Sequence, residues 1–126
     1  MFPYQIRGVS KHMIQSLYNK MLEYLKMDTE IDFKEFNDYY KTTLEELEKN
    51  YKQYDQEKGI QALFVMDNLK TNSDSRINRK FPEAKKYKKI SERSKVWVEA
   101  LFLHLLQQGM TDKEIQAKIE ELYELA

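Results

Sequence analysis

The side chains that could carry catalysis in this 126-residue chain are few, and their spacing matches no catalytic motif. His12 and His104 are its two histidines, and neither belongs to the HxxxH or HExxH patterns of zinc enzymes. There is no cysteine, which excludes a thiol nucleophile and cysteine-ligated zinc. The three glycines lie too far apart for a P-loop or a dinucleotide-binding motif. We therefore expect no catalytic residue, no cofactor and no metal, and a protein that is not an enzyme.

Carboxylates are frequent and could in principle bind a cation. The segment from Ile31 to Phe36, IDFKEF, resembles the end of a calcium-binding EF-hand loop. In such a loop Tyr24 and Lys26 would stand where calcium needs oxygen ligands, so calcium binding is not predicted. Asp32 and Glu35 instead match an acidic variant of the capping box that starts a helix.

The composition predicts a single all-α domain over residues 1–126. Hydrophobic residues make up 41% of the chain and aromatic residues 13%, which is enough for a compact core. The chain holds three glycines and two prolines, so turns should be few and helices long. We expect a compact antiparallel bundle of five to six helices, in which residues 1–9 could be flexible and residues 71–80 form a polar loop.

Apolar residues that recur every three or four positions locate the helices. The predicted helices span about residues 11–26, 33–54, 60–70, 82–89, 92–108 and 112–125. The short helix after Pro82 could merge with the next one. Ser10 is the expected N-cap of the first helix. Thr111 and Glu114 match a capping box for the last helix, and Gly109 is the expected stop before it.

The segment 92–108 is apolar on almost every side, which is typical of a central helix. We expect His104 to be buried there with a hydrogen-bond partner. We expect Glu99 to mark the one edge of that helix that faces solvent, because buried acids are rare.

A long apolar stripe follows the helix predicted over residues 33–54. Its three- and four-residue steps could serve a bundle core or the seam of an antiparallel dimer. The residues of this possible partner-helix face are Phe33, Phe36, Tyr40, Leu44, Leu47 and Tyr51.

Charge is segregated along a chain whose formal net charge is zero. Residues 59–98 carry ten cationic and four acidic side chains, and most of the cations lie between residues 76 and 95. Cations interleaved with aromatic rings could hold a phosphate backbone and stack on bases. The candidate contacts are Arg76, Arg79, Lys80, Lys85, Lys86, Tyr87, Lys88, Lys89 and Arg93. The alternative is a solvated helix face, or a surface that pairs with the acidic helix over residues 33–54.

Together these patterns favour a non-enzymatic regulatory or adaptor protein that acts by binding another protein or a second copy of itself. The alternative is an accessory nucleic-acid-binding protein that uses the basic segment 76–95. The apolar stretch from Val96 to Leu106 is too short to cross a bilayer, so no membrane partner is expected. The start of the chain lacks the apolar core of a signal peptide, and with the absence of cysteine this favours a cytoplasmic location.

Overall fold

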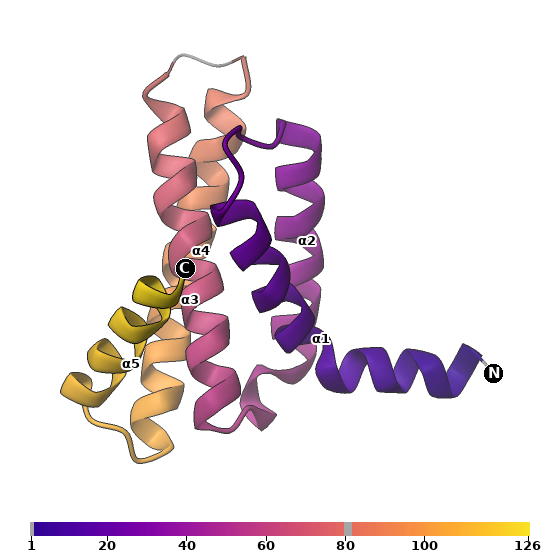
Figure 1. The fold of residues 1–126 in the computed structure, drawn as a ribbon, viewed down its shortest axis with the longest axis vertical. Helices are drawn as coiled ribbons and strands as arrows, with labels where there is room; N and C mark the ends of the chain where they lie inside the picture. Colours follow the sequence, from indigo (N-terminus) through magenta and orange to yellow (C-terminus); the bar gives the residue numbers. More distant parts are fainter. Residues whose placement is uncertain (1, 80–81) are drawn as a thin grey trace.

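The computed structural model describes residues 2–79 and 82–126, and for residues 2–12 the backbone only. Within these residues the chain forms five α-helices and a single 3₁₀ turn, with no strand, so the predicted all-α class is confirmed. The elements are α1 (Phe2–Leu25), α2 (Phe33–Asn50), η1 (Tyr51–Gln53), α3 (Gln56–Ile77), α4 (Ala84–Gln107) and α5 (Asp112–Leu125) (Figure 1).

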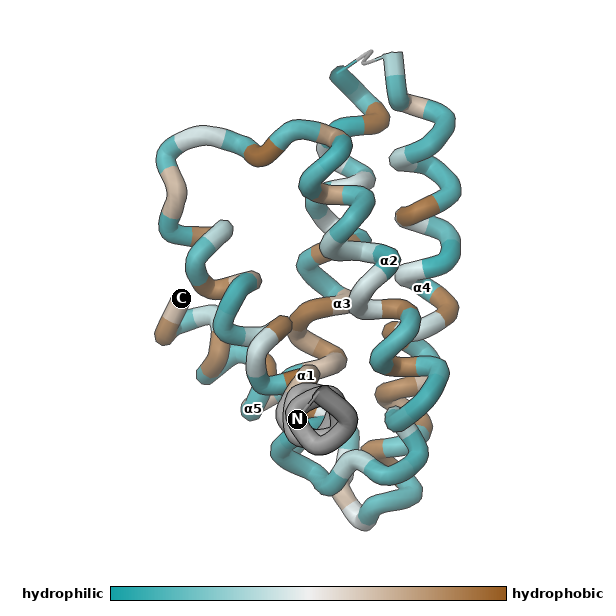
Figure 2. The backbone as a smooth tube through the Cα atoms, turned by 90° about the vertical axis from the view of Figure 1, so that its right-hand side faces the viewer, coloured by the Kyte–Doolittle hydropathy of each residue, from teal (hydrophilic) through white to brown (hydrophobic). Residues whose placement is uncertain are grey.

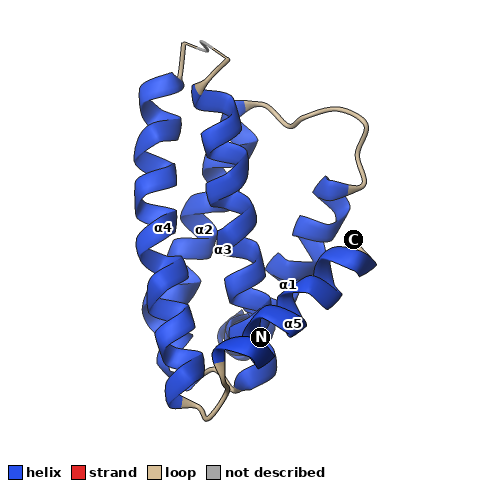
Figure 3. Ribbon diagram, turned by 90° about the vertical axis from the view of Figure 1, so that its left-hand side faces the viewer, coloured by secondary structure: helices blue, strands red, loops and turns tan. Residues whose placement is uncertain are grey.

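The helices form a bundle organised around α3. Helices α2, α3 and α4 run alongside one another, and α1 and α5 both lie on the side of α3 that faces away from α4 (Figure 3). Helix α3 contacts α1, α4 and α5, and its contact with α4 is the most extensive in the described chain. Hydrophobic and hydrophilic stretches alternate along the helices, as expected for elements that bury one face (Figure 2).

The central helix is α3, so the prediction that the helix at 92–108 is central was wrong. In α3 every residue from Gly59 to Met66 is buried, whereas the segment 92–108 leaves three large apolar side chains exposed. Helix α3 can be enclosed on all sides although it carries polar residues, because some of these residues form hydrogen bonds within α3 or with α1. The Asn68 side-chain amide donates to the Phe64 carbonyl at 2.8 Å, and that of Gln61 donates to the Gln15 side chain at 2.9 Å.

The polar loop predicted at 71–80 was also wrong for most of its length, because α3 continues to Ile77. Its polar side chains stabilise the helix from within. The amide of Asn72 donates to the Asn68 carbonyl at 2.8 Å, and Lys70 pairs with Asp74 at 2.8 Å, one turn apart. Only residues 78 and 79 are described as a turn, and Lys80 lies outside the described residues.

Other helix boundaries differ from the predicted ones, some by a few residues and others by more than one helical turn. Helix α1 begins at Phe2, before the predicted cap at Ser10, and α2 ends at Asn50 and passes into η1. Helix α3 begins four residues earlier than predicted, because the Asp55 side chain accepts the Lys58 backbone N–H at 2.9 Å and caps it. The helices predicted at 82–89 and 92–108 are one continuous helix, α4.

The caps predicted for α2 and α5 are present, with one change. Thr111 and Glu114 form both hydrogen bonds of the capping box of α5, at 2.9 and 3.1 Å, and Gly109 adopts the left-handed φ of 97°. Asp32 caps α2 by accepting the Glu35 N–H at 2.9 Å. The Glu35 carboxylate does not close that box, and accepts the Tyr24 hydroxyl at 2.8 Å instead.

Small residues let α3 and α4 approach closely, whereas rings hold α2 away from α4. A Cβ atom on Gly59 would lie 2.7 Å from Leu105 Cδ2, and Ala62, Ser73 and Ser94 are completely buried. Between α2 and α4 the contacts include edge-to-face ring pairs, such as Phe36 with Tyr87 at 5.3 Å between centroids.

The buried serines of the α3–α4 contact give a test of this packing. The Ser94 hydroxyl is fully buried and has no hydrogen-bond partner among the described residues, whereas the Ser91 hydroxyl donates to Asp74. We expect Ser94→Ala to raise the free energy of unfolding by about 0.5 kcal/mol, since alanine is the better helix former and removes an unpartnered hydroxyl. Ser91→Ala should lower it by about 1 kcal/mol. Urea unfolding measures both, and shifts of the same sign would contradict the packing.

Candidate functional site

Arg76 and Tyr87 are buried, so they are not part of an exposed nucleic-acid surface. Arg76 is 5% exposed and Tyr87 is 2% exposed. The Arg76 guanidinium lies 4.6 Å from the ring centroid of Phe36 and 5.3 Å from that of Tyr87, and its Nη1 donates to the Tyr87 hydroxyl at 2.7 Å. These two residues therefore join α2, α3 and α4, and their assignment as nucleic-acid contacts is corrected.

A single carboxylate serves both Arg76 and Arg79. Glu30, in the loop between α1 and α2, places Oε2 at 3.6 Å from Arg76 Nε, and its Oε1 accepts a hydrogen bond from Arg79 Nη1. Glu30 and Arg79 are both about half-exposed, whereas Arg76 is not. The basic segment is thus partly neutralised by a residue that is distant in sequence.

The remaining cations of the segment lie on the outside of α4. Lys85, Lys86, Lys88 and Lys89 are exposed, and within the described chain none of them forms an ion pair with a carboxylate. Lys86 lies over the Phe33 ring at 5.2 Å. Arg93 pairs with Glu48 of α2 at 3.5 Å, which is the kind of pairing with the acidic helix that the charge pattern left open.

The apolar stripe of α2 is used inside the chain. Phe36 and Leu47 are buried, and the other four residues are half-buried against the core. Phe33 and Phe36 contact the Tyr87 ring at 5.2 and 5.3 Å between centroids. Most of the stripe therefore completes the bundle of one chain, and only Tyr40 and Leu44 keep part of their surface at a shallow hollow between α2 and α4.

An exposed apolar set lies on α4 instead, and the sequence did not single it out. Val96 is 58% exposed, Leu103 is 55% exposed and Leu106 is 39% exposed. Spacings of seven and three residues place them on one side of the helix, together with Glu99, which is exposed as predicted. Periodicity did not single out this face, because residues 92–108 are apolar on almost every side. The charged residues at the same helical spacing could have identified it as the exposed face.

His104 is buried as predicted, and it belongs to a polar cluster at the end of α2. Its Nε2 lies 2.9 Å from the Tyr54 carbonyl oxygen. The Tyr54 hydroxyl donates to the buried Glu46 carboxylate at 2.6 Å, and Asn50 donates to the same carboxylate at 3.1 Å. Burial raises the pKa of Tyr54, and the bond to Glu46 adds to the effect. This cluster fixes the chain reversal between α2 and α3. The part of the chain that the structure describes holds no group of three or more histidine, aspartate or glutamate side chains that could bind a metal ion.

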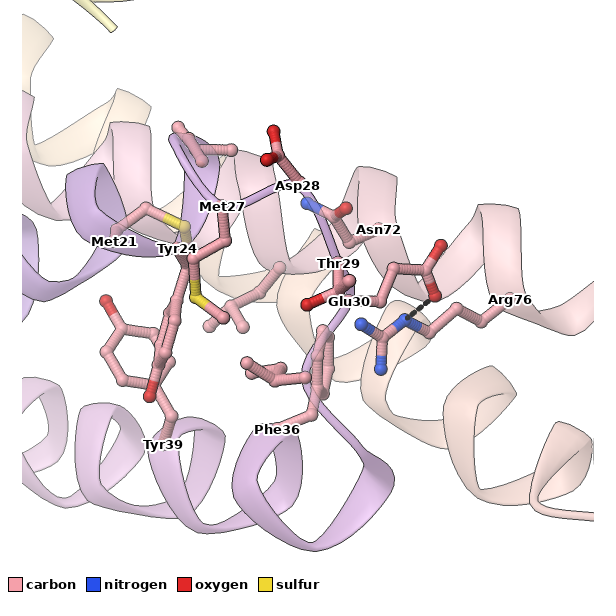
Figure 4. A pocket seen from close by; sticks show the side chains of 13 residues that line it. Met21, Tyr24, Met27, Asp28, Thr29, Glu30, Phe36, Tyr39, Asn72 and Arg76 are labelled. Carbon is pink, nitrogen blue, oxygen red and sulfur yellow. Dashed lines mark ion pairs between the residues drawn. The ribbon is translucent and has the colours of Figure 1, made fainter.

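A cavity of about 230 Å³ lies between the end of α1, the loop after it, α2 and α3 (Figure 4). Its walls are mostly apolar, and Arg76, Asn72 and Thr29 supply polar groups. The Tyr24 and Tyr39 hydroxyls are engaged, with Glu35 at 2.8 Å and the Leu17 carbonyl at 2.5 Å. Burial raises the pKa of both tyrosines, so neither serves as an acid or a base near neutral pH. The lining residues are Met21, Tyr24, Leu25, Met27, Asp28, Thr29, Glu30, Ile31, Phe36, Tyr39, Leu69, Asn72 and Arg76.

Comparison of the chain with family models, with curated proteins and with solved structures finds no match. In the described residues, no helix has the length and apolar character needed to span a membrane.

The Asp74 carboxylate gives a pH-dependent test of the α3–α4 contact. The hydrogen bond from Lys70 lowers the pKa of Asp74, and the bond from Ser91 lowers it further. A carboxyl whose pKa is lowered by folding stabilises the protein above its ordinary pKa of about 4 and loses this effect as pH falls through the lowered value. We expect Asp74→Asn to lower the free energy of unfolding at pH 7 by less than about 1 kcal/mol, since the site is half-exposed.

The difference between wild type and Asp74→Asn should shrink as pH falls below about 4. Thermal unfolding between pH 7 and pH 2 measures it. Asp38→Asn is the matched control, because Asp38 pairs with Lys34 on an exposed helix face with no hydrogen bond to another helix. An Asp74→Asn effect that is constant with pH would contradict the assignment.

Proposed function

We propose that this chain is a non-enzymatic binding module whose outer α4 face binds a partner protein, as a regulatory or adaptor protein does. The observation that supports this most is the exposure of Val96, Leu103 and Leu106 on one side of a helix that is otherwise packed in the bundle. Large exposed apolar side chains that are grouped together and bordered by charged residues are characteristic of interaction surfaces.

An acidic amphipathic helix is the partner that this face fits. The first turns of α4 carry four exposed lysines without carboxylate partners among the described residues, and the apolar set follows two to three turns later. A shallow hollow between α2 and α4 lies beside this face, and its lining residues are Tyr40, Leu44, Lys89, Glu92, Arg93 and Val96. A partner helix with apolar residues at one end and carboxylates at the other would match both halves.

A nucleic-acid role is the second candidate, and the same four lysines support it. Closely spaced cations at 85, 86, 88 and 89 could contact successive phosphates. The burial of Arg76 and Tyr87 removes the ring and one of the arginines that this role would have used. Binding of this kind would be purely electrostatic and lost at moderate salt.

The proposal is tested with a synthetic acidic amphipathic helical peptide and a scrambled peptide of the same composition, by fluorescence anisotropy. We expect the amphipathic peptide to bind and the scrambled one to bind at least about tenfold more weakly. Leu103→Glu should weaken binding about tenfold or more, because it removes an apolar contact worth about 1.5 kcal/mol and adds repulsion. Lys88→Glu combined with Lys89→Glu should weaken it in a salt-dependent manner.

Leu125→Glu is the matched control, since Leu125 is 73% exposed but lies at the end of α5. It should leave peptide affinity unchanged. Equal affinity of the scrambled peptide, or an effect of Leu125→Glu as large as that of Leu103→Glu, would contradict the proposal. A dimer in light scattering that Leu103→Glu dissociates would identify the partner as a second copy. Duplex or single-stranded nucleic acid bound by wild type and by Leu103→Glu, but not by the lysine variant, would favour the second candidate.

A further inference from the structure

The cavity is lined by a buried cation, the guanidinium of Arg76, whose charge the protein only partly neutralises. Arg76 makes one hydrogen bond with its side chain among the described residues, from Nη1 to the Tyr87 hydroxyl. The closest carboxylate, Glu30, lies 3.6 Å from Nε, beyond hydrogen-bonding distance. The edge of the guanidinium formed by Nε and Nη2 thus keeps its N–H donors, although the residue is 5% exposed. In the described chain the fully buried side-chain polar atoms without a partner belong to Gln61, Ser73 and Ser94, so the Nε and Nη2 edge of Arg76 is accessible to a small acceptor in the cavity.

The position of Glu30 leaves room for another acceptor. Its second oxygen already bonds to Arg79, so this carboxylate keeps a cationic partner if a ligand takes the Arg76 edge. Asp28 also lines the cavity, but it is exposed and lies away from the guanidinium (Figure 4). Thr29 lines the same cavity from the loop after α1, and Asn72 lines it from α3 (Figure 4).

The rest of the wall is apolar and limits the ligand's size. Met21, Met27, Ile31, Phe36 and Leu69 line it, which suits a short hydrocarbon chain or a single side chain. A volume of about 230 Å³ is smaller than the usual sites for drug-sized ligands. The two carboxylates at the rim would repel a multiply charged ligand such as a phosphate monoester, so a single negative charge fits best.

We infer that this cavity binds a small monocarboxylate with an apolar tail, held by bidentate hydrogen bonds from Nε and Nη2 of Arg76. The planar pair of N–H groups on that edge matches the two oxygens of a carboxylate. Glu30 acts as an internal competitor that approaches the same edge when the site is empty. The cavity is separate from the outer α4 face. The inference of a carboxylate site and the proposed partner binding are therefore independent of each other.

Two sources could supply this chemistry, a free short-chain carboxylate or the C-terminus of a peptide that ends in an apolar residue. The probes are therefore hexanoate against hexanol, and a short peptide ending in leucine with a free or an amidated carboxyl group. Two-dimensional NMR of the full chain follows the amides around the cavity during each titration. We expect hexanoate or the free peptide to shift amides near Thr29 and Asn72, and expect hexanol and the amidated peptide not to do so. The probe that binds more tightly identifies the source.

Two substitutions test the role assigned to Arg76. Arg76→Met should weaken carboxylate binding about tenfold or more, because a charge-assisted bidentate contact is lost. Since that buried residue also joins three helices, Glu30→Gln at the exposed loop is the second variant. It should tighten binding several-fold by removing the competing charge. Arg93→Ala, which removes an exposed cation elsewhere, should leave affinity unchanged.

No carboxylate-dependent shift at millimolar concentration would overturn the inference. So would weaker binding in Glu30→Gln, because that result would make Glu30 a ligand contact and not a competitor. Equal shifts by hexanoate and hexanol would reduce the cavity to a simple apolar pocket and would also overturn it.

Discussion

The positive charge of Arg76, enclosed by aromatic rings, holds the bundle together near the C-terminal end of α3. Removing a guanidinium from water is expensive, and the protein offsets this cost at Arg76 with two ring faces, a tyrosine hydroxyl and a nearby carboxylate. These groups come from three elements: the Phe36 ring from α2, the ring and hydroxyl of Tyr87 from α4, and the Glu30 carboxylate from the loop between α1 and α2. The requirement to surround one charge thus helps to fix the position of the α1–α2 loop and of α2 against α3 and α4, and it shapes the cavity beside them.

The two kinds of helix contact explain which surfaces remain open. Helices α3 and α4 approach closely because Gly59, Ala62 and the buried serines occupy little space. With α1 and α5 both on the other side of α3, no described element is left to cover the outside of α4 (Figure 3). Helix α2 is kept at a distance by the ring pairs that Phe33 and Phe36 form with Tyr87. The exposed apolar residues of α4 therefore follow from the way in which α3 is enclosed.

Much of the fold could be predicted from local signals, whereas the candidate sites could not. Helical periodicity gave the class, and side-chain capping gave the start of α2 and α5, because these features depend on residues within one or two turns. The continuation of α3 through Asn72 and Asp74 was missed, because polar residues that bond within their own helix look like a loop in sequence. The grouping of Glu30 with Arg76 and Arg79 depends on chain segments that meet only after folding. The exposure of Val96 and Leu103 depends on how many elements cover α4, which periodicity does not reveal.

The hairpin of α3 and α4 also has a consequence for chain entropy. The Ser91–Asp74 bond near its turn closes a loop of 17 residues, whereas the bonds at its far end, from Gln56 to Gln108 and from His104 to Tyr54, join positions 52 and 50 apart. Closure entropy rises with the logarithm of loop length, so the turn end is the least costly contact to form first. Once the turn end is closed, each later contact between the two helices has to fix only a few more residues. The further loss of conformational entropy at each step is therefore small. The most extensive interface of the protein is in this way also the one that its chain can assemble by successive short steps.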